Sequence, residues 1–328
     1  MNATRISVAI PLHDEAAVFP ELMRRVTEVV DALPGGPHEI VLVDDGSEDE
    51  TFELVREAAA RDGRVVGVRL SRNFGHQAAL TAALEAVSGD VVVVMDGDLQ
   101  DRPEEIPRFL AEHERGYDVV YAQRTRRKEG LALRASYYLF YRLLNRLSEL
   151  EVPVDSGDFA LLSRRVVDEL NRLPERHRYL RGLRTWVGFR QTGVAVERDQ
   201  RAGGDPSYTT GKLLKLAFDG IFSFSVSPLR AAWILGAVAS AAASVYALYA
   251  IFQRLFLGGT PQGFTALIVA ITFFAGIQLL FLGLIGEYLG RVYDEAKGRP
   301  HFVIVDVVRG DGMERAPADA SGATADAR

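Results

Sequence analysis

The sequence predicts an α/β domain with a mostly parallel sheet and helices on both faces, followed by a pair of apolar helices. Two observations support this fold class. Short β-branched runs alternate with helical patterns over the first 120 residues, which is typical of a parallel sheet covered on both faces. Further along, residues 231–252 and 264–286 contain no charged side chain. The mean hydropathy of +0.03 over 328 residues is therefore an average over two unlike parts.

The elements of the first part follow in order along the chain. The predicted strands are 6–10, 39–43, 65–70, 91–95 and 119–121. The predicted helices are 18–33, 51–61, 77–87 and 104–115. Open sheets of this kind bind ligands beyond the carboxyl ends of their strands. The residues that directly follow each strand are therefore the candidates for function.

Composition and missing motifs exclude several classes of chemistry. The chain has no Cys, which excludes disulfides, thiolate metal sites and Cys nucleophiles. A net charge of −6 disfavours nucleic acid as a partner, because proteins that bind it carry a basic excess. No G-x-G-x-x-G follows a predicted strand and no G-x-S-x-G occurs. Neither a dinucleotide oxidoreductase nor an α/β-hydrolase is therefore indicated.

Polar residues, many of them acidic, follow every predicted strand. They are residues 13–15, 44–47, 71–76, 96–101 and 123–124. Asp96 and Asp98 form a D-x-D that could hold Mg²⁺ or Mn²⁺ through carboxylate oxygens, and such an ion would neutralise a departing nucleotide diphosphate. Each motif taken singly could instead be a turn or a helix cap. Their joint occurrence after successive strands favours a binding site.

The two charge-free runs are each long enough for a helix to cross a hydrocarbon core about 30 Å thick. We predict a transmembrane hairpin over 230–290, with spans at about 231–252 and 264–286; two buried helices of a soluble domain are the alternative. Cations flank the hairpin at both ends, namely Lys212, Lys215, Arg230, Arg291, Lys297 and Arg299. The positive-inside rule therefore predicts a multi-pass protein of the cell membrane with its N-terminal domain in the cytoplasm.

The remaining boundaries follow from composition. Residues 1–205 form the cytosolic domain, where the apolar run at 6–12 soon meets His13 and Asp14, so no signal peptide is expected. Residues 206–229 are an amphipathic segment that could lie in the membrane interface or pack on the domain as a surface helix. Residues 291–309 form a cytosolic C-terminal segment. Residues 310–328 have almost no large apolar group and are expected to be disordered.

Several short motifs together resemble one known family. They are I-P at 10–11 with Glu15, VDDGS at 43–47, RNFGH at 72–76, MDGDLQD at 95–101, DF at 158–159, RGL at 181–183, and FS and PLR within 224–230. These motifs, together with the chain around them over about residues 5–302, resemble the inverting GT-A glycosyltransferases of family 2. Within that family it is similar to the polyprenyl-phosphate glycosyltransferases (GtrB-like), which are akin to dolichyl-phosphate mannosyltransferase. The resemblance implies a Rossmann-like GT-A catalytic domain.

The resemblance also implies a role for each matching residue. The pocket for a nucleotide sugar would be formed by Pro11, Glu15, Asp44, Asp45, Asn73, Gly75, Asp96 and Gln100. Asp98 would be the most direct metal ligand, with Asp96 serving the metal or the ribose. Asp158 matches the position usually proposed as the catalytic base, and Asp155 is its nearby competitor. The candidates for binding diphosphate or acceptor phosphate are Arg124, Arg198 and Arg201.

The acceptor chemistry bears on what Asp158 would do. A polyprenyl phosphate is an anion at pH 7, so its oxygen can attack the anomeric carbon without losing a proton. Asp158 could therefore orient the acceptor or stabilise an oxocarbenium-like transition state rather than act as a strong base. The basic and aromatic run at 124–146 suits an anionic lipid head, or else it is a solvated helix face.

Two departures from related sequences refine the expectation. Pro206 and Ser207 stand where many relatives have a Lys, which puts one expected phosphate contact in doubt; Arg201 or Lys212 could supply it. The Q-x-x-R-W marker of processive synthases is missing, so transfer of a single sugar is favoured over polymerisation.

The sequence therefore predicts an enzyme that transfers one sugar from a UDP- or GDP-linked donor to undecaprenyl or decaprenyl phosphate, with inversion. We predict glucose from UDP-glucose, because the residues at 76–77 and 98–100 are more similar to those of the glucosyltransferases in this family. The alternatives are mannose or another sugar, another lipid acceptor such as diacylglycerol, and a non-catalytic nucleotide-sugar-binding partner of a flippase. Relatives assemble through their membrane region, which implies a homo-oligomer, with a tetramer as one option.

Overall fold

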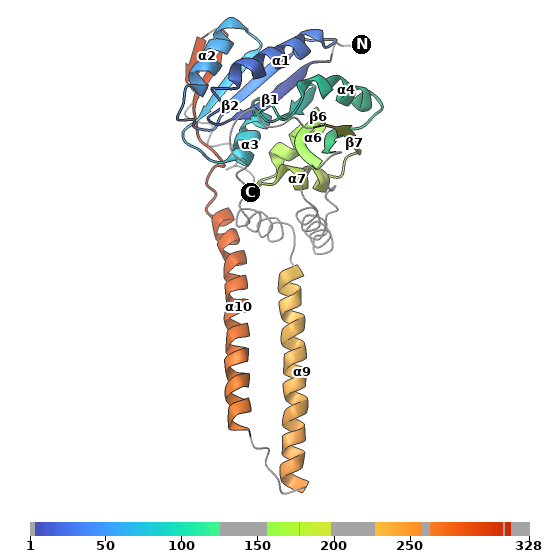
Figure 1. Cartoon of the computed structure of the whole chain (residues 1–328), viewed down its shortest axis with the longest axis vertical. Helices are drawn as coiled ribbons and strands as arrows, with labels where there is room; N and C mark the ends of the chain where they lie inside the picture. Colours follow the sequence, from blue (N-terminus) through green and yellow to red (C-terminus); the bar gives the residue numbers. More distant parts are fainter. Residues whose placement is uncertain are drawn as a thin grey trace, which may run out of the picture. The chain divides into compact units, whose positions relative to one another are not determined.

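The computed structural model of the chain (Figure 1) describes residues 4–124, 156–176, 178–197, 227–256, 263–310 and 312–315. The chain divides into two compact units. The first holds residues 1–139, 150–209 and 299–328, and the second holds 140–149 and 210–298. The first unit therefore takes in segments from both sides of the apolar helices.

The first unit is built on a nine-stranded sheet in the order β7-β5-β6-β4-β1-β2-β3-β8-β9. The strands are β1 (Ile6–Leu12), β2 (Glu39–Asp44), β3 (Val65–Leu70), β4 (Val91–Val94), β5 (Val119–Arg124), β6 (Ser156–Ser163), β7 (Gln191–Val196), β8 (Ile304–Arg309) and β9 (Gly312–Arg315). The four strands β4-β1-β2-β3 run parallel. Their side chains are buried on both faces, which is why these strands read as continuous apolar runs.

The helices of this unit place their apolar faces on the sheet. They are α1 (Phe19–Ala32), α2 (Thr51–Arg61), α3 (His76–Ala86), the 3₁₀ turn η1 (Pro103–Glu105), α4 (Ile106–Glu114), α6 (Arg164–Arg172) and α7 (Leu180–Trp186). In α1, for example, Leu22, Val26 and Val29 recur at helical spacing and are buried in the core. All five predicted strands and all four predicted helices are confirmed, with small shifts at their ends.

The strand β6 was not predicted, and it changes the topology. It lies between β4 and β5 and is antiparallel to both. The sheet is therefore mixed, although mostly parallel, as the predicted fold class requires. Because β6 runs against β4, the beginning of β6 lies beside the carboxyl end of β4.

The C-terminal part of the chain returns to the same sheet. β8 pairs antiparallel with β3, and β9 pairs with β8. Residues 304–309, which were predicted to belong to a segment separate from the domain at 1–205, pair with the sheet of that domain. Gly312–Arg315, within the range 310–328 that was predicted to be disordered, form β9 in a ladder with β8.

The second unit holds two long helices, α9 (Ser227–Phe256) and α10 (Phe264–Ala296). The stretches Ala232–Gln253 and Val269–Ala296 are long and apolar enough to cross a membrane, and none of their most apolar windows is buried within the chain. Trp233, Leu255 and Leu279 are among the large apolar side chains that are at least 70% exposed. Soluble proteins rarely expose such surfaces, which favours membrane association over the alternative of two helices buried in a soluble domain. The predicted interfacial segment up to residue 226 lies outside the described residues.

Candidate active site

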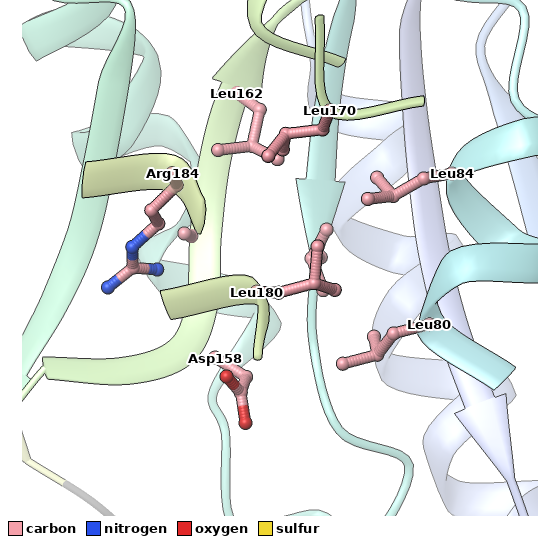
Figure 2. Close-up of a pocket in the computed structure, with 9 residues that line it drawn as sticks. Leu80, Leu84, Asp158, Leu162, Leu170, Leu180 and Arg184 are labelled. Carbon is pink, nitrogen blue, oxygen red and sulfur yellow. The ribbon is translucent and has the colours of Figure 1, made fainter. Parts of the chain in front are cut away.

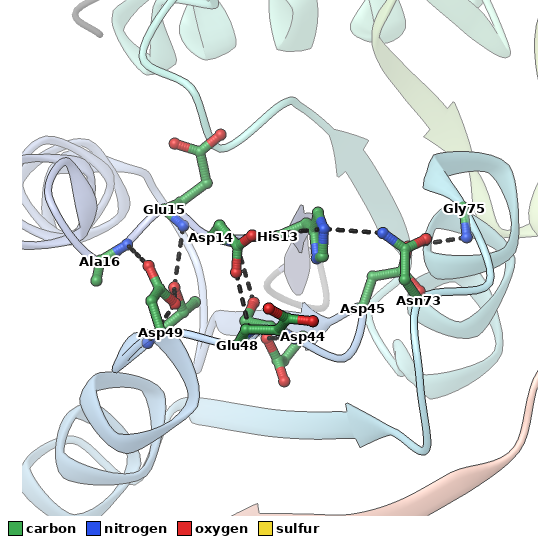
Figure 3. Close-up of polar contacts among 12 residues, drawn as sticks. His13, Asp14, Glu15, Ala16, Asp44, Asp45, Glu48, Asp49, Asn73 and Gly75 are labelled. Carbon is green, nitrogen blue, oxygen red and sulfur yellow. Dashed lines mark hydrogen bonds and ion pairs between the residues drawn. The ribbon is translucent and has the colours of Figure 1, made fainter. Parts of the chain in front are cut away.

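The loops that follow β1 and β2 are joined by a ladder of hydrogen bonds at the carboxyl edge of the sheet (Figure 3). The amide of Asp14 donates to Ser47 Oγ (3.0 Å), and the amide of Glu48 donates back to Asp14 Oδ1 (2.9 Å). The amide of Glu15 donates to Thr51 Oγ1 (2.9 Å). These bonds satisfy backbone groups that have no partner within the sheet. They also hold the loops after β1 and β2 together as one surface, which we call the floor of the site.

Asp45 ties this floor to the loop that follows β3. Its carboxylate accepts the amides of Phe74 (2.8 Å) and Gly75 (2.9 Å). Burial raises the pKa of Asp45, and these two hydrogen bonds offset part of the rise. Next to it, Gly46 has φ +64°, and a Cβ there would lie 2.4 Å from the carbonyl carbon of Arg72. Only glycine allows the two loops to approach this closely.

Asp44, at the end of β2, stabilises the loop that follows this strand. Its side chain has no exposed surface, its Oδ1 accepts the amide of Ser47 (3.2 Å), and its Oδ2 lies 3.6 Å from Arg69 Nε. Burial raises the pKa of Asp44. Asp44 therefore supports the loop from within the protein, and its direct contact with a nucleotide sugar stays a prediction.

Other residues predicted for the nucleotide-sugar pocket surround this floor. Pro11 is buried at the end of β1, and Asn73 is exposed, with its Nδ2 2.8 Å from His13 Nε2. His13 is exposed, and this contact brings it into the site. The Glu15 side chain is turned away from the ladder of hydrogen bonds (Figure 3). Glu15 and Asn73 thus present polar groups at the open side of the floor.

The D-x-D forms a tight loop after β4. The amide of Asp96 donates to Asp101 Oδ2 (3.2 Å), and the amide of Gln100 donates to Asp98 Oδ1 (3.1 Å). Between the two acids, a Cβ on Gly97 would lie 2.5 Å from Leu12 Cδ2 and 3.2 Å from the Pro11 carbonyl oxygen. The loop therefore packs directly against the end of β1, which brings the D-x-D beside the loops already described.

Asp158 lies near the beginning of β6, next to the strand β4 that the D-x-D loop follows. Its register follows from β6, because Val94 of β4 pairs with Ala160 of β6. Asp96 comes two residues after Val94, and Asp158 comes two residues before Ala160. Because the strands are antiparallel, both positions lie on the same side of the pair. The geometry of the sheet therefore brings these two carboxylates to the same place.

Two basic side chains lie next to these carboxylates. His76, the first residue of α3, has its Nε2 3.6 Å from Asp96 Oδ1 and 3.5 Å from Asp158 Oδ2. Arg181 of α7 donates from Nε to Asp158 Oδ1 (2.8 Å) and from Nη2 to Asp158 Oδ2 (3.0 Å). The site thus contains the cationic groups that closely spaced carboxylates require.

These contacts determine the protonation states. Burial acts to raise the pKa of Asp158, but the charges and hydrogen bonds of Arg181 and His76 outweigh it, so the pKa of Asp158 lies well below its usual range. Burial acts to lower the pKa of His76, but Asp158 and Asp96 raise it by more. Asp158 is therefore ionised at neutral pH and is a weak proton acceptor.

Arg184, one turn after Arg181 on α7, is a buried cation behind Asp158. Only 4% of it is exposed, its Nε and Nη2 have no hydrogen-bond partner in the described part of the chain, and its guanidinium carbon lies 5.1 Å from the centre of the Tyr121 ring. Burial lowers the pKa of Arg184 to about 10. It lines a cavity of about 20 Å³ with Asp158 and several Leu side chains (Figure 2), which has room for about one water molecule and none for a substrate.

The sequence did not single out His76, Arg181 or Arg184 as site residues. His76 and Arg181 stand inside the matching motifs RNFGH and RGL, and that was the available signal. Of the predicted phosphate-binding residues, the backbone of Arg124 ends β5, paired with Val196. Arg198, Arg201 and Asp155 lie outside the described residues.

The D-x-D fits a hard divalent cation by its donor set. Asp96 and Asp98 supply carboxylate oxygens on one loop, and over the described part of the chain no group of three or more His, Asp or Glu side chains could hold a metal by itself. Mg²⁺ typically binds proteins through one or two carboxylates and completes its shell with water and substrate phosphates. Two carboxylates on the loop that follows β4 match that pattern.

Comparisons with known proteins identify the family of the chain. Residues 7–170 match glycosyl transferase family 2. The uncharacterized glycosyltransferase YkcC of Bacillus subtilis is 43% identical over 91% of this chain and 92% of its own length. The prophage bactoprenol glucosyl transferase homolog of Escherichia coli K12 is 36% identical over 92% of this chain and 98% of its own.

Two further comparisons extend these findings. The bactoprenol glucosyl transferase derived from prophage SfII in Shigella flexneri is 36% identical over 94% of this chain and 99% of its own. Among solved structures, glucosyl-3-phosphoglycerate synthase of Mycobacterium tuberculosis, in complex with Mn²⁺, UDP-glucose and phosphoglyceric acid, is 20% identical, with a TM-score of 0.44 and 67% and 78% of the two chains covered. The chain is thus a glycosyltransferase that belongs to glycosyl transferase family 2 and is similar over almost its whole length to bactoprenol glucosyl transferases.

Proposed function

We propose that this enzyme transfers a single glucose from UDP-glucose to a polyprenyl phosphate at the cytoplasmic face of the cell membrane, with inversion. The observation that carries the proposal is the meeting of Asp96, His76 and Asp158 beyond the strand ends of a chain that also has two apolar helices long enough to span a bilayer. The relatives named bactoprenol glucosyl transferase support both the sugar and the lipid, because bactoprenol is a polyprenol.

The donor would lie over the floor formed by the loops after β1, β2 and β3. Asn73 and Glu15 offer polar groups to its base and ribose, and Gln100 lies at the D-x-D beside its sugar. Asp96 and Asp98 would hold a divalent cation, which supplies charge neutralisation to the departing diphosphate when bound. Asp44 and Asp45 act by holding these loops in place.

Asp158 would act on charge and orientation rather than as a base. Its carboxylate already accepts two hydrogen bonds from Arg181, and its lowered pKa makes it a poor proton acceptor. A phosphate monoester has a second pKa of about 6, so the acceptor oxygen needs no deprotonation at pH 7. A fixed negative charge beside the reacting carbon would stabilise the oxocarbenium-like character of the transition state.

The test is a transfer assay on membranes that contain the full chain. Membranes are incubated with labelled UDP-glucose or GDP-mannose, polyprenyl phosphate and Mn²⁺ or Mg²⁺, and labelled lipid is extracted. Glucosyl lipid that depends on added polyprenyl phosphate is the expected product. Labelled mannosyl lipid would replace the donor assignment, and no labelled lipid with any common donor, from folded protein, would refute the proposed transfer.

A further inference from the structure

A second, larger cavity opens next to the carboxylate site and is strongly cationic. Its volume is about 410 Å³, and its lining includes Arg72, His76, Arg176, Arg178 and His301. Among the described residues that line it, none is Asp or Glu. A cavity of this size with converging guanidinium groups is suited to an anion with several oxygen atoms.

Three segments that are distant in sequence build this cavity. Arg72 and His76 come from the loop after β3 and the first turn of α3, Arg176 and Arg178 precede α7, and His301 precedes β8. Hydrogen bonds hold these segments together. Arg176 Nη1 donates to the Arg299 carbonyl oxygen (3.0 Å), the amide of Ser71 donates to the Val303 carbonyl oxygen (2.8 Å), and the amide of Leu180 donates to Gln77 Oε1 (2.9 Å).

The state of Arg178 is the strongest indication that the cavity binds an anion. Arg178 is 8% exposed, its Nη2 donates to the Leu170 carbonyl oxygen, and its buried Nε has no hydrogen-bond partner among the described residues. Glu85 and Glu175 are the acidic groups that act on its charge, and neither lines the cavity. A buried guanidinium with an unused donor is costly. The first turn of α3 adds the positive end of a helix dipole.

Two features of position indicate which anion would bind. His76 belongs both to this cavity and to the carboxylate site, because its Nε2 contacts Asp96 and Asp158. His301 lies five residues after Ala296, the last residue of α10. At about 3.6 Å per residue, the chain cannot separate them by more than about 18 Å. The cavity is therefore adjacent to the Asp96 and Asp158 carboxylates, and along the chain one of its lining residues follows the apolar helix α10 after only a few residues.

We propose that this cavity binds the phosphate group of the acceptor lipid, with Arg176, Arg178 and His301 as its anchors. This inference rests on the proposed function, since it assigns the acceptor site of that reaction. The chemistry recognised is a phosphate monoester, which a lipid headgroup or free inorganic phosphate could supply. The cavity would hold the acceptor oxygen beside His76 and Asp158 while the polyprenyl chain remains in the bilayer.

The experiment compares the full-length enzyme in lipid nanodiscs with the variant Arg176→Gln/His301→Gln. Arg172→Gln is the matched control, because Arg172 is on the exposed side of α6, where it pairs with Glu169. The KM for polyprenyl phosphate should rise about tenfold or more in the double variant, since charge-assisted hydrogen bonds to phosphate are lost. The KM for the nucleotide sugar and the affinity for UDP should stay unchanged in both proteins.

A binding measurement separates the sources of phosphate and the two proposals. A soluble short-chain prenyl phosphate should bind the wild type more tightly than inorganic phosphate does, and the double variant should lose that binding. This loss would support the cavity assignment even if no sugar were transferred, a result that would refute only the proposed function. Equal binding of inorganic phosphate, an unchanged KM for the lipid, or a selective loss of UDP affinity would each overturn the assignment.

Discussion

The Arg181 guanidinium binds the Asp158 carboxylate with two parallel hydrogen bonds, Nε to Oδ1 at 2.8 Å and Nη2 to Oδ2 at 3.0 Å. Such a planar pair fixes both groups in orientation as well as in charge. His76 adds a second positive group at 3.5 Å. The carboxylate is thus a fixed negative charge near the beginning of β6, which is the basis of the first prediction.

Asp158→Asn should lower both the transfer rate and the stability of the catalytic unit. Loss of the charge leaves Arg181 and His76 without their partner, and breaking a buried ion pair costs about 3–5 kcal/mol in the free energy of unfolding. Transfer should fall by about 100-fold or more, because a charge aimed at the transition state is lost. Asp168→Asn is the control, since Asp168 is half exposed on α6.

The stability difference for Asp158→Asn should also depend on pH. The folded-state pKa of Asp158 is lowered, so its stabilisation is complete above the unfolded-state pKa of about 3.9 and is lost as the pH falls below that value. Thermal unfolding of wild type and variant at pH 7 and at decreasing pH checks this. A difference that stays constant below pH 4 would contradict the ion-pair account.

Asp98→Ala should abolish turnover that depends on a divalent cation, because only Asp96 would remain as a carboxylate ligand on the loop. The measurement is labelled lipid formed at increasing Mn²⁺ concentration. Asp90→Asn is the control, since Asp90 precedes the opposite end of β4 and accepts the amide of Arg5. Metal-dependent activity in the Asp98 variant at the wild-type level would refute the metal assignment.

Gly46→Ala should displace the loop that follows β3 and so weaken donor binding. The new Cβ would lie within 2.7 Å of three backbone atoms of Arg72 and Asn73, at a φ of +64°, and strain of this kind costs about 1–3 kcal/mol. We expect a higher KM for the nucleotide sugar and a lower melting temperature. Gly63→Ala is the control, because a Cβ there meets no atom within 4 Å; equal behaviour of the two variants would show that the loop contact is unimportant.

Removal of the C-terminal strand β8 should destabilise the catalytic unit. A chain that stops at residue 209 lacks β8, which leaves the edge of β3 exposed and open to pairing with other chains. A chain in which a flexible Gly/Ser linker replaces 210–298 keeps β8. We expect aggregation of the first and soluble monomer of the second in size-exclusion chromatography. The reverse order would mean that β8 does not stabilise the sheet.

Much of the fold could be predicted because its signals are local. The strands at 39–44 and 65–70 are β-branched runs, and the helix at 51–61 repeats its apolar residues at helical spacing. Strand β6 escaped prediction because its eight residues, SGDFALLS, begin with turn-forming residues. β8 escaped because it follows a membrane-type helix, where nothing local indicates a return to the sheet.

The candidate site was predicted in part. Asp96, Asp98 and Asp158 were named from motifs, and the structure brings Asp96 and Asp158 to the same histidine. Asp44 was assigned to the ligand as well, and the structure shows that its side chain is buried; sequence position at a strand end does not tell whether a side chain faces outward or into a loop. Direct ligand contacts stay predictions for all of the named residues.

The sequence alone determined the alternation of strands and helices, the acidic strand ends, and the two apolar spans, since each depends on residues within one turn or one strand of each other. Only the tertiary structure decided that His76, Asp96, Asp158 and Arg181 form one site and that β8 closes the sheet beside β3. These residues are far apart along the chain. Their contact depends on the antiparallel direction of β6 and on strand order, which are set by long-range pairing that no local pattern encodes.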